Sequence, residues 1–179
     1  VPPVMHGNEL VVRRAMADRR WLVRVGRSLR HLGVCPATTE AAASCAQHLR
    51  RMIPVIGDSA VHIGRGLLES IPLELTPEHG IKASKYVIVS DDNVWRLYGA
   101  RLMVAFRAAG YTQPTSPGEA VPDGQKTLLA FQVAPGEDSK SRSTKDAIED
   151  YMLSYKCNRD TCMLAFGGGV VRSLQCHVI

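Results

Sequence analysis

The stretch Thr161–Val171, TCMLAFGGGVV, indicates the fold more clearly than any other part of the chain. Its first six residues form an apolar run with the length and composition of a buried strand, and three glycines follow directly. Glycine has no Cβ atom, so the backbone of the turn after this strand can approach a phosphate group closely. The stretch therefore predicts a strand that leads into an anion-binding turn.

Two earlier segments repeat the order of buried strand, polar loop and helix. Residues 86–89 (YVIV) precede the polar loop SDDN, and residues 94–110 then show helical spacing that closes on a glycine. Residues 127–133 precede PGEDSKS, and residues 141–156 carry the next helical pattern. Three such units in succession imply a parallel sheet with crossover helices. The predicted fold class is α/β, with a Rossmann-like sheet and flanking helices.

The segment before these units predicts a small β-hairpin. Residues 53–56 and 60–63 have strand composition, and Gly57-Asp58 between them is a strong turn pair. A helix is expected after Gly66. The glycines of GRGLLE do not complete a GxGxxG fingerprint, because Glu69 stands at the third position. Residues 111–126, which hold three prolines and two glycines, are expected to form a surface loop.

The three polar loops are expected to share one edge of the sheet, since ligands of such sheets bind at the carboxyl ends of the strands. An acid at a strand end can accept hydrogen bonds from ribose hydroxyls, and the lysine and hydroxyl of PGEDSK can contact phosphate or ribose. Each loop alone has a purely structural alternative. Asp91 could cap a helix, Ser139 and Lys140 could form a solvated turn, and the glycines could be a plain turn.

Four segments, taken together and in this order, resemble 3-dehydroquinate synthase, especially the form at the start of the fungal pentafunctional AROM polypeptide. They are VIGDSAVHIGRGLLE (residues 55–69), YVIVSDDNV (86–94), PGEDSKSRSTKDAIEDYMLS (135–154) and CNRDTCMLAFGGGVV (157–171). The resemblance runs over about residues 54–171. It divides the chain into a basic extension (1–51), an NAD-binding α/β domain (52–171) and a tail (172–179) that does not match.

The resemblance implies an enzyme that converts 3-deoxy-D-arabino-heptulosonate 7-phosphate into 3-dehydroquinate and phosphate, in the shikimate pathway. It implies NAD as cofactor, a divalent metal, usually zinc, a small-molecule substrate and a homodimer. Carried over position by position, the cofactor contacts fall on Asp91, Asp92, Asn93, Glu137, Asp138, Ser139, Lys140, Gly168, Gly169 and Val170.

The resemblance also has a departure, at Ser173, where the family has an aspartate that contacts the cofactor. The phosphate-binding Arg and Lys residues, the Glu and two His metal ligands and the helical second domain of the family would lie after Ile179. The interpretation is an incomplete NAD-binding domain without catalytic or metal-binding residues of its own, and we expect no synthase turnover from it alone. The alternatives are a non-catalytic nucleotide-binding or interaction module with a basic arm, and a glycerol-dehydrogenase-like enzyme, against which PGEDSKSRSTK argues.

The first 51 residues differ in composition from the rest. They carry nine arginines, no lysine and three acidic residues, which gives this segment a formal charge of +6. The whole chain has a formal net charge of +5, so the remaining residues together carry −1 and are close to neutral. Residues 11–32 show an imperfect basic amphipathic pattern, which predicts a helix or a disordered extension. A transit segment, a membrane-surface helix, a nucleic-acid arm and sequence never selected as protein are all open alternatives.

Length and composition narrow the remaining classes. A chain of 179 residues that is 45% hydrophobic suits a single globular domain, and it has no apolar run long enough to cross a membrane. Five cysteines without framework spacing or a secretory signal favour a reducing compartment, so we expect a cytoplasmic protein, with organelle targeting as the alternative. The two cysteines of CNRDTC have a spacing that could suggest a zinc site, but a structural role for their thiols is favoured. No nucleic-acid partner is expected.

Overall fold

The fold is built on one sheet whose order in space is β3-β4-β1-β2-β8-β5-β7-β6. The computed structural model describes residues 8–15, 20–27, 51–54, 60–64, 66–75, 77, 81–119, 121–122 and 124–177. The strands in this part of the chain are β1 (Asn8–Ala15), β2 (Arg20–Arg27), β3 (Arg51–Pro54), β4 (Ala60–Gly64), β5 (Lys85–Asp91), β6 (Tyr111–Thr112), β7 (Lys126–Val133) and β8 (Thr161–Phe166).

The parallel part of the sheet confirms the predicted fold class. β8, β5, β7 and β6 pair in parallel, with Tyr86 opposite Leu128 on one side and Cys162 on the other. β5 and β8 are covered on both faces, and every residue of β8 is buried. Burial on two faces explains why both strands read as continuous apolar runs and not as alternating ones.

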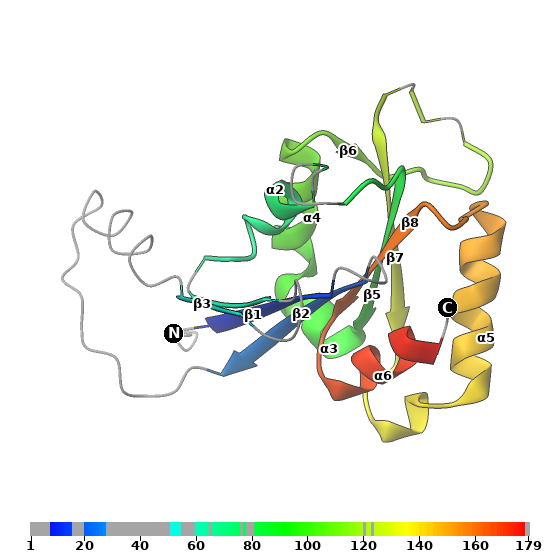
Figure 1. Ribbon diagram of the computed structural model, residues 1–179. Coiled ribbons are helices and arrows are strands. Elements are labelled where there is room, and N and C mark those ends of the chain that lie inside the picture. Colours follow the sequence, from blue (N-terminus) through cyan, green and yellow to red (C-terminus); the bar gives the residue numbers. More distant parts are fainter. Residues whose placement is uncertain are drawn as a thin grey trace, which may run out of the picture.

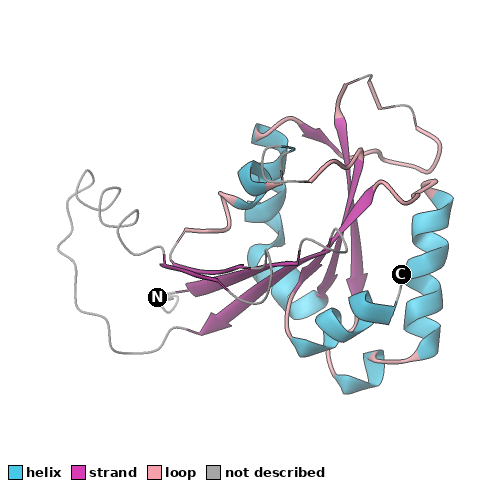
Figure 2. Cartoon of the chain, in the orientation of Figure 1, coloured by secondary structure: helices cyan, strands magenta, loops and turns pink. Residues whose placement is uncertain are grey.

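Helices cover the two faces of this sheet (Figures 1 and 2). One face packs against α2 (Ile71–Glu74) and the continuous helical segment α3 (Asp92–Val94), η2 (Trp95–Gly99) and α4 (Ala100–Ala108). The other packs against α5 (Arg142–Ser154) and α6 (Gly169–His177). Alternate residues of β5 enter the two cores, Tyr86 and Ile88 on the α4 side and Val87 and Val89 on the α5 side.

The predicted helix at residues 94–110 is confirmed, with one local feature that the pattern did not indicate. Its residues Trp95–Gly99 form a turn of π-helix. A Cβ atom on Gly99 would lie 2.7 Å from Cδ2 of the Trp95 ring, so only glycine lets the indole pack against this turn. The helix ends before Gly110, whose φ of +82° suits glycine.

The prediction of a helix within residues 11–32 is wrong, because the described part of this segment forms the strands β1 and β2. The two strands pair antiparallel with Val12 opposite Val23, β1 also pairs with β4, and β2 runs parallel to β8. Pairing along whole strands outweighs the weak preference of an imperfect helical pattern. The sheet thus contains strands from both sides of the composition break near Arg51.

The remaining elements agree with the sequence in kind and differ in extent. β3 and β4 form the predicted antiparallel hairpin, whereas its Gly57-Asp58 turn lies outside the described residues. The helix expected after Gly66 is the short α2, which follows a turn at residues 67–70. The expected loop at 111–126 begins with β6, which pairs with β7. Residues 172–177, assigned to the tail, continue α6.

Candidate functional site

The three polar loops lie together at one edge of the sheet, as their position after parallel strands predicted. β5 ends at Asp91, β7 ends before the loop that contains η3 (Glu137–Ser139), and β8 ends at the glycines. In Figure 1 this edge is the lower one, where α3, the η3 loop and the start of α6 come close to one another. The sequence thus predicted where the chemically useful side chains gather.

Asp91 has a structural role and leaves one oxygen for a ligand. Its Oδ1 accepts a hydrogen bond from the backbone N–H of Val94 at 3.0 Å and so caps α3. The carboxylate is half-buried at the end of β5. Asp92 and Asn93 follow in the first helical turn with exposed side chains. The capping alternative and a ligand contact are therefore compatible for Asp91.

The loop after β8 packs directly against this carboxylate. A Cβ atom on Gly167 would lie 2.9 Å from Oδ2 of Asp91 and 2.9 Å from Cγ2 of Val171, so any side chain there would displace one of them. Gly168 and Gly169 are exposed, with open space where a Cβ atom would be. Backbone from Gly168 onward is thus accessible to a ligand beside the Asp91 carboxylate, and α6 begins there.

The loop after β7 is held by its own side chains. The Ser139 hydroxyl is buried and donates to the carbonyl of Ala134 at 2.6 Å, so its hydrogen is used within the loop. Glu137 forms an ion pair with Lys140 at 2.6 Å, and Asp138 is exposed. Ser141 caps α5 by accepting from the N–H of Thr144 at 3.2 Å.

A cleft of about 420 Å³ joins the loop after β7 to the helix after β8. The residues around it come from the start of α5 and from the second turn of α6. They are Lys140, Ser141, Arg142, Lys145, Ser173 and Leu174. Sequence reasoning identified Lys140 and missed Arg142 and Lys145. The available signal was the run SKSRSTK, which places three cations within six residues of one helix start.

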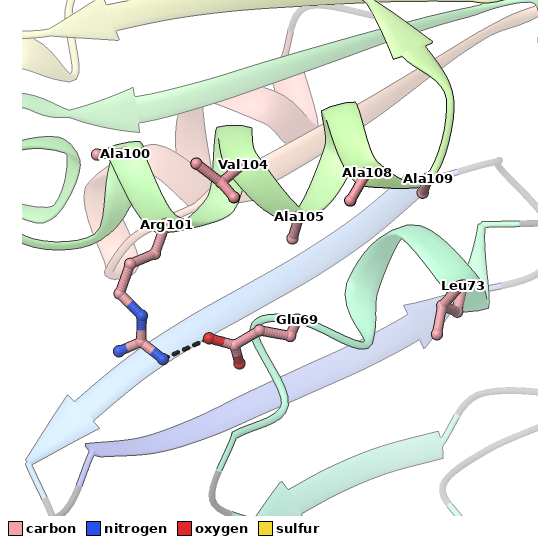
Figure 3. Close-up of a pocket in the computed structure, with 8 residues that line it drawn as sticks. All are labelled: Glu69, Leu73, Ala100, Arg101, Val104, Ala105, Ala108 and Ala109. Atoms are coloured by element: carbon pink, nitrogen blue, oxygen red, sulfur yellow. Dashed lines mark hydrogen bonds and ion pairs between the residues drawn. The ribbon is translucent and has the colours of Figure 1, made fainter.

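A second cleft, of about 580 Å³, lies between α2 and α4 (Figure 3). Half of its described lining residues are alanine, and Leu73 and Val104 are also apolar. Its two charged groups, Arg101 and Glu69, are paired with each other. The figure shows this pair at one end of the alanine row. Such a surface offers little to a charged ligand, so the edge with the three loops is the better candidate site.

The described residues do not offer a metal centre, since they contain no group of three or more His, Cys, Asp or Glu side chains placed to hold one. Cys157 and Cys162 of CNRDTC are thiols, and Cys162 lies buried in β8. Burial raises the pKa of the Cys157 thiol, which keeps it protonated at neutral pH.

None of the described helices is long and apolar enough to cross a bilayer.

Comparison with known proteins confirms the resemblance seen in the sequence. The family model described as the N-terminal part of 3-dehydroquinate synthase matches residues 130–179, a range that includes the segment set apart as a tail. The pentafunctional AROM polypeptide of Yarrowia lipolytica is 44% identical over 128 residues, and that of Schizosaccharomyces pombe is 32% identical over 128. Both alignments cover 70% of this chain but only 8% and 7% of the relatives, so the chain spans less than a tenth of their length.

Solved structures support the same fold. The crystal structure of 2-deoxy-scyllo-inosose synthase superposes with a TM-score of 0.51 over 72% of this chain and 32% of that one, at 16% identity. A second structure of that enzyme, also with a TM-score of 0.51, holds carbaglucose-6-phosphate, NAD⁺ and Co²⁺. The similarities to this chain are thus to a family of enzymes, and at 16% identity the structures establish the fold alone.

Proposed function

We propose that the edge formed by the loops after β5, β7 and β8 binds NAD. The observation that carries this proposal is the contact between Asp91 and Gly167, which brings a strand-end carboxylate within 2.9 Å of the Cβ position of a glycine turn. In sheets of this class, an acid at a strand end holds a ribose and a glycine turn at a helix start holds a pyrophosphate. Here both features lie side by side.

Each part of the edge has a distinct task in this proposal. Oδ2 of Asp91 accepts hydrogen bonds from the ribose hydroxyls, while Oδ1 keeps the loop in place through Val94. The backbone of Gly168 and Gly169 approaches the pyrophosphate, where a side chain would stand in the way. Val170, half-buried at the start of α6, contacts the cofactor through its apolar side chain. Glu137 and Lys140, paired with each other in the loop after β7, form the side of the site opposite the glycines.

We further propose that the chain supplies the dinucleotide-binding part of a 3-dehydroquinate synthase. Bound NAD would accept a hydride from a hydroxyl of the heptulosonate phosphate and later return it, and the residues named above would hold and orient it. The support is the match of residues 130–179 to the synthase family and 44% identity to an AROM polypeptide. The zinc ion and the homodimer expected from the resemblance, and the cytoplasmic location expected from the cysteine pattern, remain parts of this proposal.

Titration calorimetry of the 179-residue chain with NAD tests the cofactor proposal. We expect saturable binding that Gly168→Val weakens strongly, because a branched side chain would occupy the space beside the exposed backbone. A matched control is Ala108→Val, which adds a branched side chain at an exposed position near the end of α4, at the opposite edge of the sheet. Equal NAD binding by Gly168→Val and the unaltered chain would contradict the proposed site.

Phosphate release from the heptulosonate substrate, with NAD and zinc present, tests the wider proposal. We expect none from this chain alone, since its described residues hold no metal-binding group. Turnover that appears when the chain is mixed with the remaining part of an AROM synthase region would support its role as the dinucleotide-binding part. NAD binding without such complementation would contradict the synthase proposal and leave the cofactor proposal standing.

A further inference from the structure

The cleft between the start of α5 and α6 carries more positive charge than the dinucleotide proposal uses, because that proposal involves only Lys140 of its cations. Three cationic side chains line it, those of Lys140, Arg142 and Lys145, and the described part of its lining contains no carboxylate. Like charges within one cleft repel each other and are tolerated when an anion sits between them. The Ser141 hydroxyl in the same lining is already bonded to the hydroxyls of Ser143 and Thr144, so the cations are the groups that an anion would meet.

The cations are only partly neutralised by their neighbours. Lys140 is paired with Glu137 at 2.6 Å, and Lys145 with Glu149 at 3.3 Å, but neither carboxylate is among the lining residues. The side chain of Glu137 is 75% exposed, so water weakens its hold on Lys140. Arg142 forms no ion pair or hydrogen bond with the described residues. The cleft thus keeps at least one full positive charge without a partner.

We propose that this cleft is a subsite for a phosphoryl group, with Arg142 as its principal ligand and Lys140 and Lys145 beside it. A planar guanidinium can bind two phosphate oxygens at once, and the two ammonium groups supply point charges around it. The N-terminus of α5 does not carry this proposal, because Ser141 already accepts from the N–H of Thr144. The binding of a phosphoryl group here does not depend on the proposed function; only the identity of the molecule that carries this group rests on it.

Two sources could present the same chemistry. One is the pyrophosphate of a dinucleotide held by the glycine loop, and the other is the phosphate ester of a sugar substrate. The cleft is lined by Ser173, one helical turn after Gly169, so it lies next to the proposed cofactor edge. Either group is therefore within reach of the same cations. If the cleft takes the pyrophosphate, free phosphate and NAD compete for it; if it takes the sugar phosphate, both bind together.

The test is a titration of the full chain with inorganic phosphate, followed by ³¹P line broadening or calorimetry. We expect saturable binding that Arg142→Gln weakens roughly tenfold, as for loss of a bidentate charged contact. Arg107→Gln is the matched control, because Arg107 is an exposed arginine near the end of α4, which covers the other face. Glu149→Gln should act in the opposite direction and strengthen binding, since it releases Lys145 from its pair.

The outcomes separate this proposal from the cofactor proposal. Absence of saturable phosphate binding, or equal weakening by Arg142→Gln and Arg107→Gln, would overturn the subsite whether or not NAD binds. If phosphate binds and competes with NAD, the cleft takes the pyrophosphate. If phosphate and NAD bind together, the cleft takes the phosphate of a sugar ester. Phosphate binding without NAD binding would support the subsite and contradict the cofactor proposal.

Discussion

The two edges of the parallel sheet use their polar groups in opposite ways. At the edge where the strands begin, the groups bond to one another. The carbonyl of Leu75 accepts from the hydroxyls of Tyr86 and Tyr111, both at 3.2 Å, and from Nζ of Lys126 at 3.1 Å. At the edge where the strands end, Asp92, Asn93, Gly168 and Gly169 are exposed. The first edge holds the fold together, while the second has groups available for a ligand.

This difference shows how one sheet can separate stability from binding. Lys126 lies 5.0 Å from the centre of the Tyr111 ring and 5.6 Å from that of Tyr86, and the two rings meet edge to face at 5.1 Å. On the same side, the ammonium of Lys85 donates to the carbonyls of Tyr155 and Lys156 at 2.7 Å and caps the end of α5. Substitutions at the two edges should therefore have separable effects.

The largest effect is expected from Tyr111→Ala. This change removes ring contacts to Tyr86 and Phe106 together with the bond to Leu75, so the free energy of unfolding should fall by about 3–5 kcal/mol. Urea denaturation measures it, and NAD affinity of the folded fraction should stay unchanged. A loss below about 1 kcal/mol would show that this edge is not the stabilising one.

Gly167→Ala should disturb both properties, because its Cβ atom would press on Asp91 and Val171. We expect NAD affinity to fall roughly a hundredfold, as a shift of about 1 Å can cost in a positioned site. The free energy of unfolding should fall by about 1–2 kcal/mol. Gly168→Ala is the matched variant, since its Cβ atom meets open space and should leave stability unchanged. Equal stability of the two variants would contradict the packing described at Gly167.

High pH should weaken the fold through the edge where the strands begin. Burial, and after it the charge of Cys162, raises the pKa of Tyr86 to about 12, and burial raises the pKa of Tyr111 further. The unfolded chain releases these protons near pH 10, so stability that is complete below pH 10 is lost as the pH rises through about 12. Burial lowers the pKa of Lys126, whose contribution has the opposite sign.

Because the pKa of Lys126 is lowered from 10.5, its opposite contribution is nearly complete below that pH, and the tyrosines dominate above it. We therefore expect a net fall on the order of 2 kcal/mol in the free energy of unfolding between pH 10 and 12. Urea denaturation across this range measures it. Tyr86→Phe should flatten the dependence, and an unchanged slope in that variant would rule out Tyr86 as a source.

The smallest effect is expected from Asp91→Asn. Asparagine caps a helix as well as aspartate does, so the free energy of unfolding should change by less than about 0.5 kcal/mol. NAD affinity should fall roughly tenfold, because hydrogen bonds from ribose hydroxyls to a neutral amide are weaker than to a carboxylate. Asp91→Ala should add a stability loss of about 1 kcal/mol through the lost cap. Equal NAD affinity in the Asn variant would remove Asp91 from the site.

Prediction from sequence was accurate where one local pattern determined the structure. The apolar runs before Asp91 and Gly167 are buried on both faces, so composition alone identified them as strands. Gly110 marked a helix end because such an end often needs a positive φ, and the helical pattern predicted from residue 141 begins at the cap Ser141. The shared edge of the three loops followed from the parallel arrangement of their strands.

Prediction failed where the structure depends on contacts between segments that are far apart in the sequence. Residues 20–27, RWLVRVGR, alternate only partly between apolar and polar residues and also fit a helical period. Their pairing with β8 is a long-range contact that no local pattern indicates. The cleft around Arg142 was missed for a related reason. A cation at the start of α5 becomes part of a site only because α6, more than twenty residues later, packs opposite it. The contact of Asp91 with Gly167 likewise exists only in the folded chain.

The π-helical turn at Trp95–Gly99 gives the molecule an optical reporter. Trp95 lies two residues after Asn93 in the sequence. Its indole packs against Gly99 and the core, beside the proposed cofactor edge. The chain has one other tryptophan, Trp21, so Trp21→Phe leaves Trp95 as the sole indole emitter. Energy transfer from excited Trp95 to the reduced nicotinamide of NADH would then report occupancy of this edge without any added label.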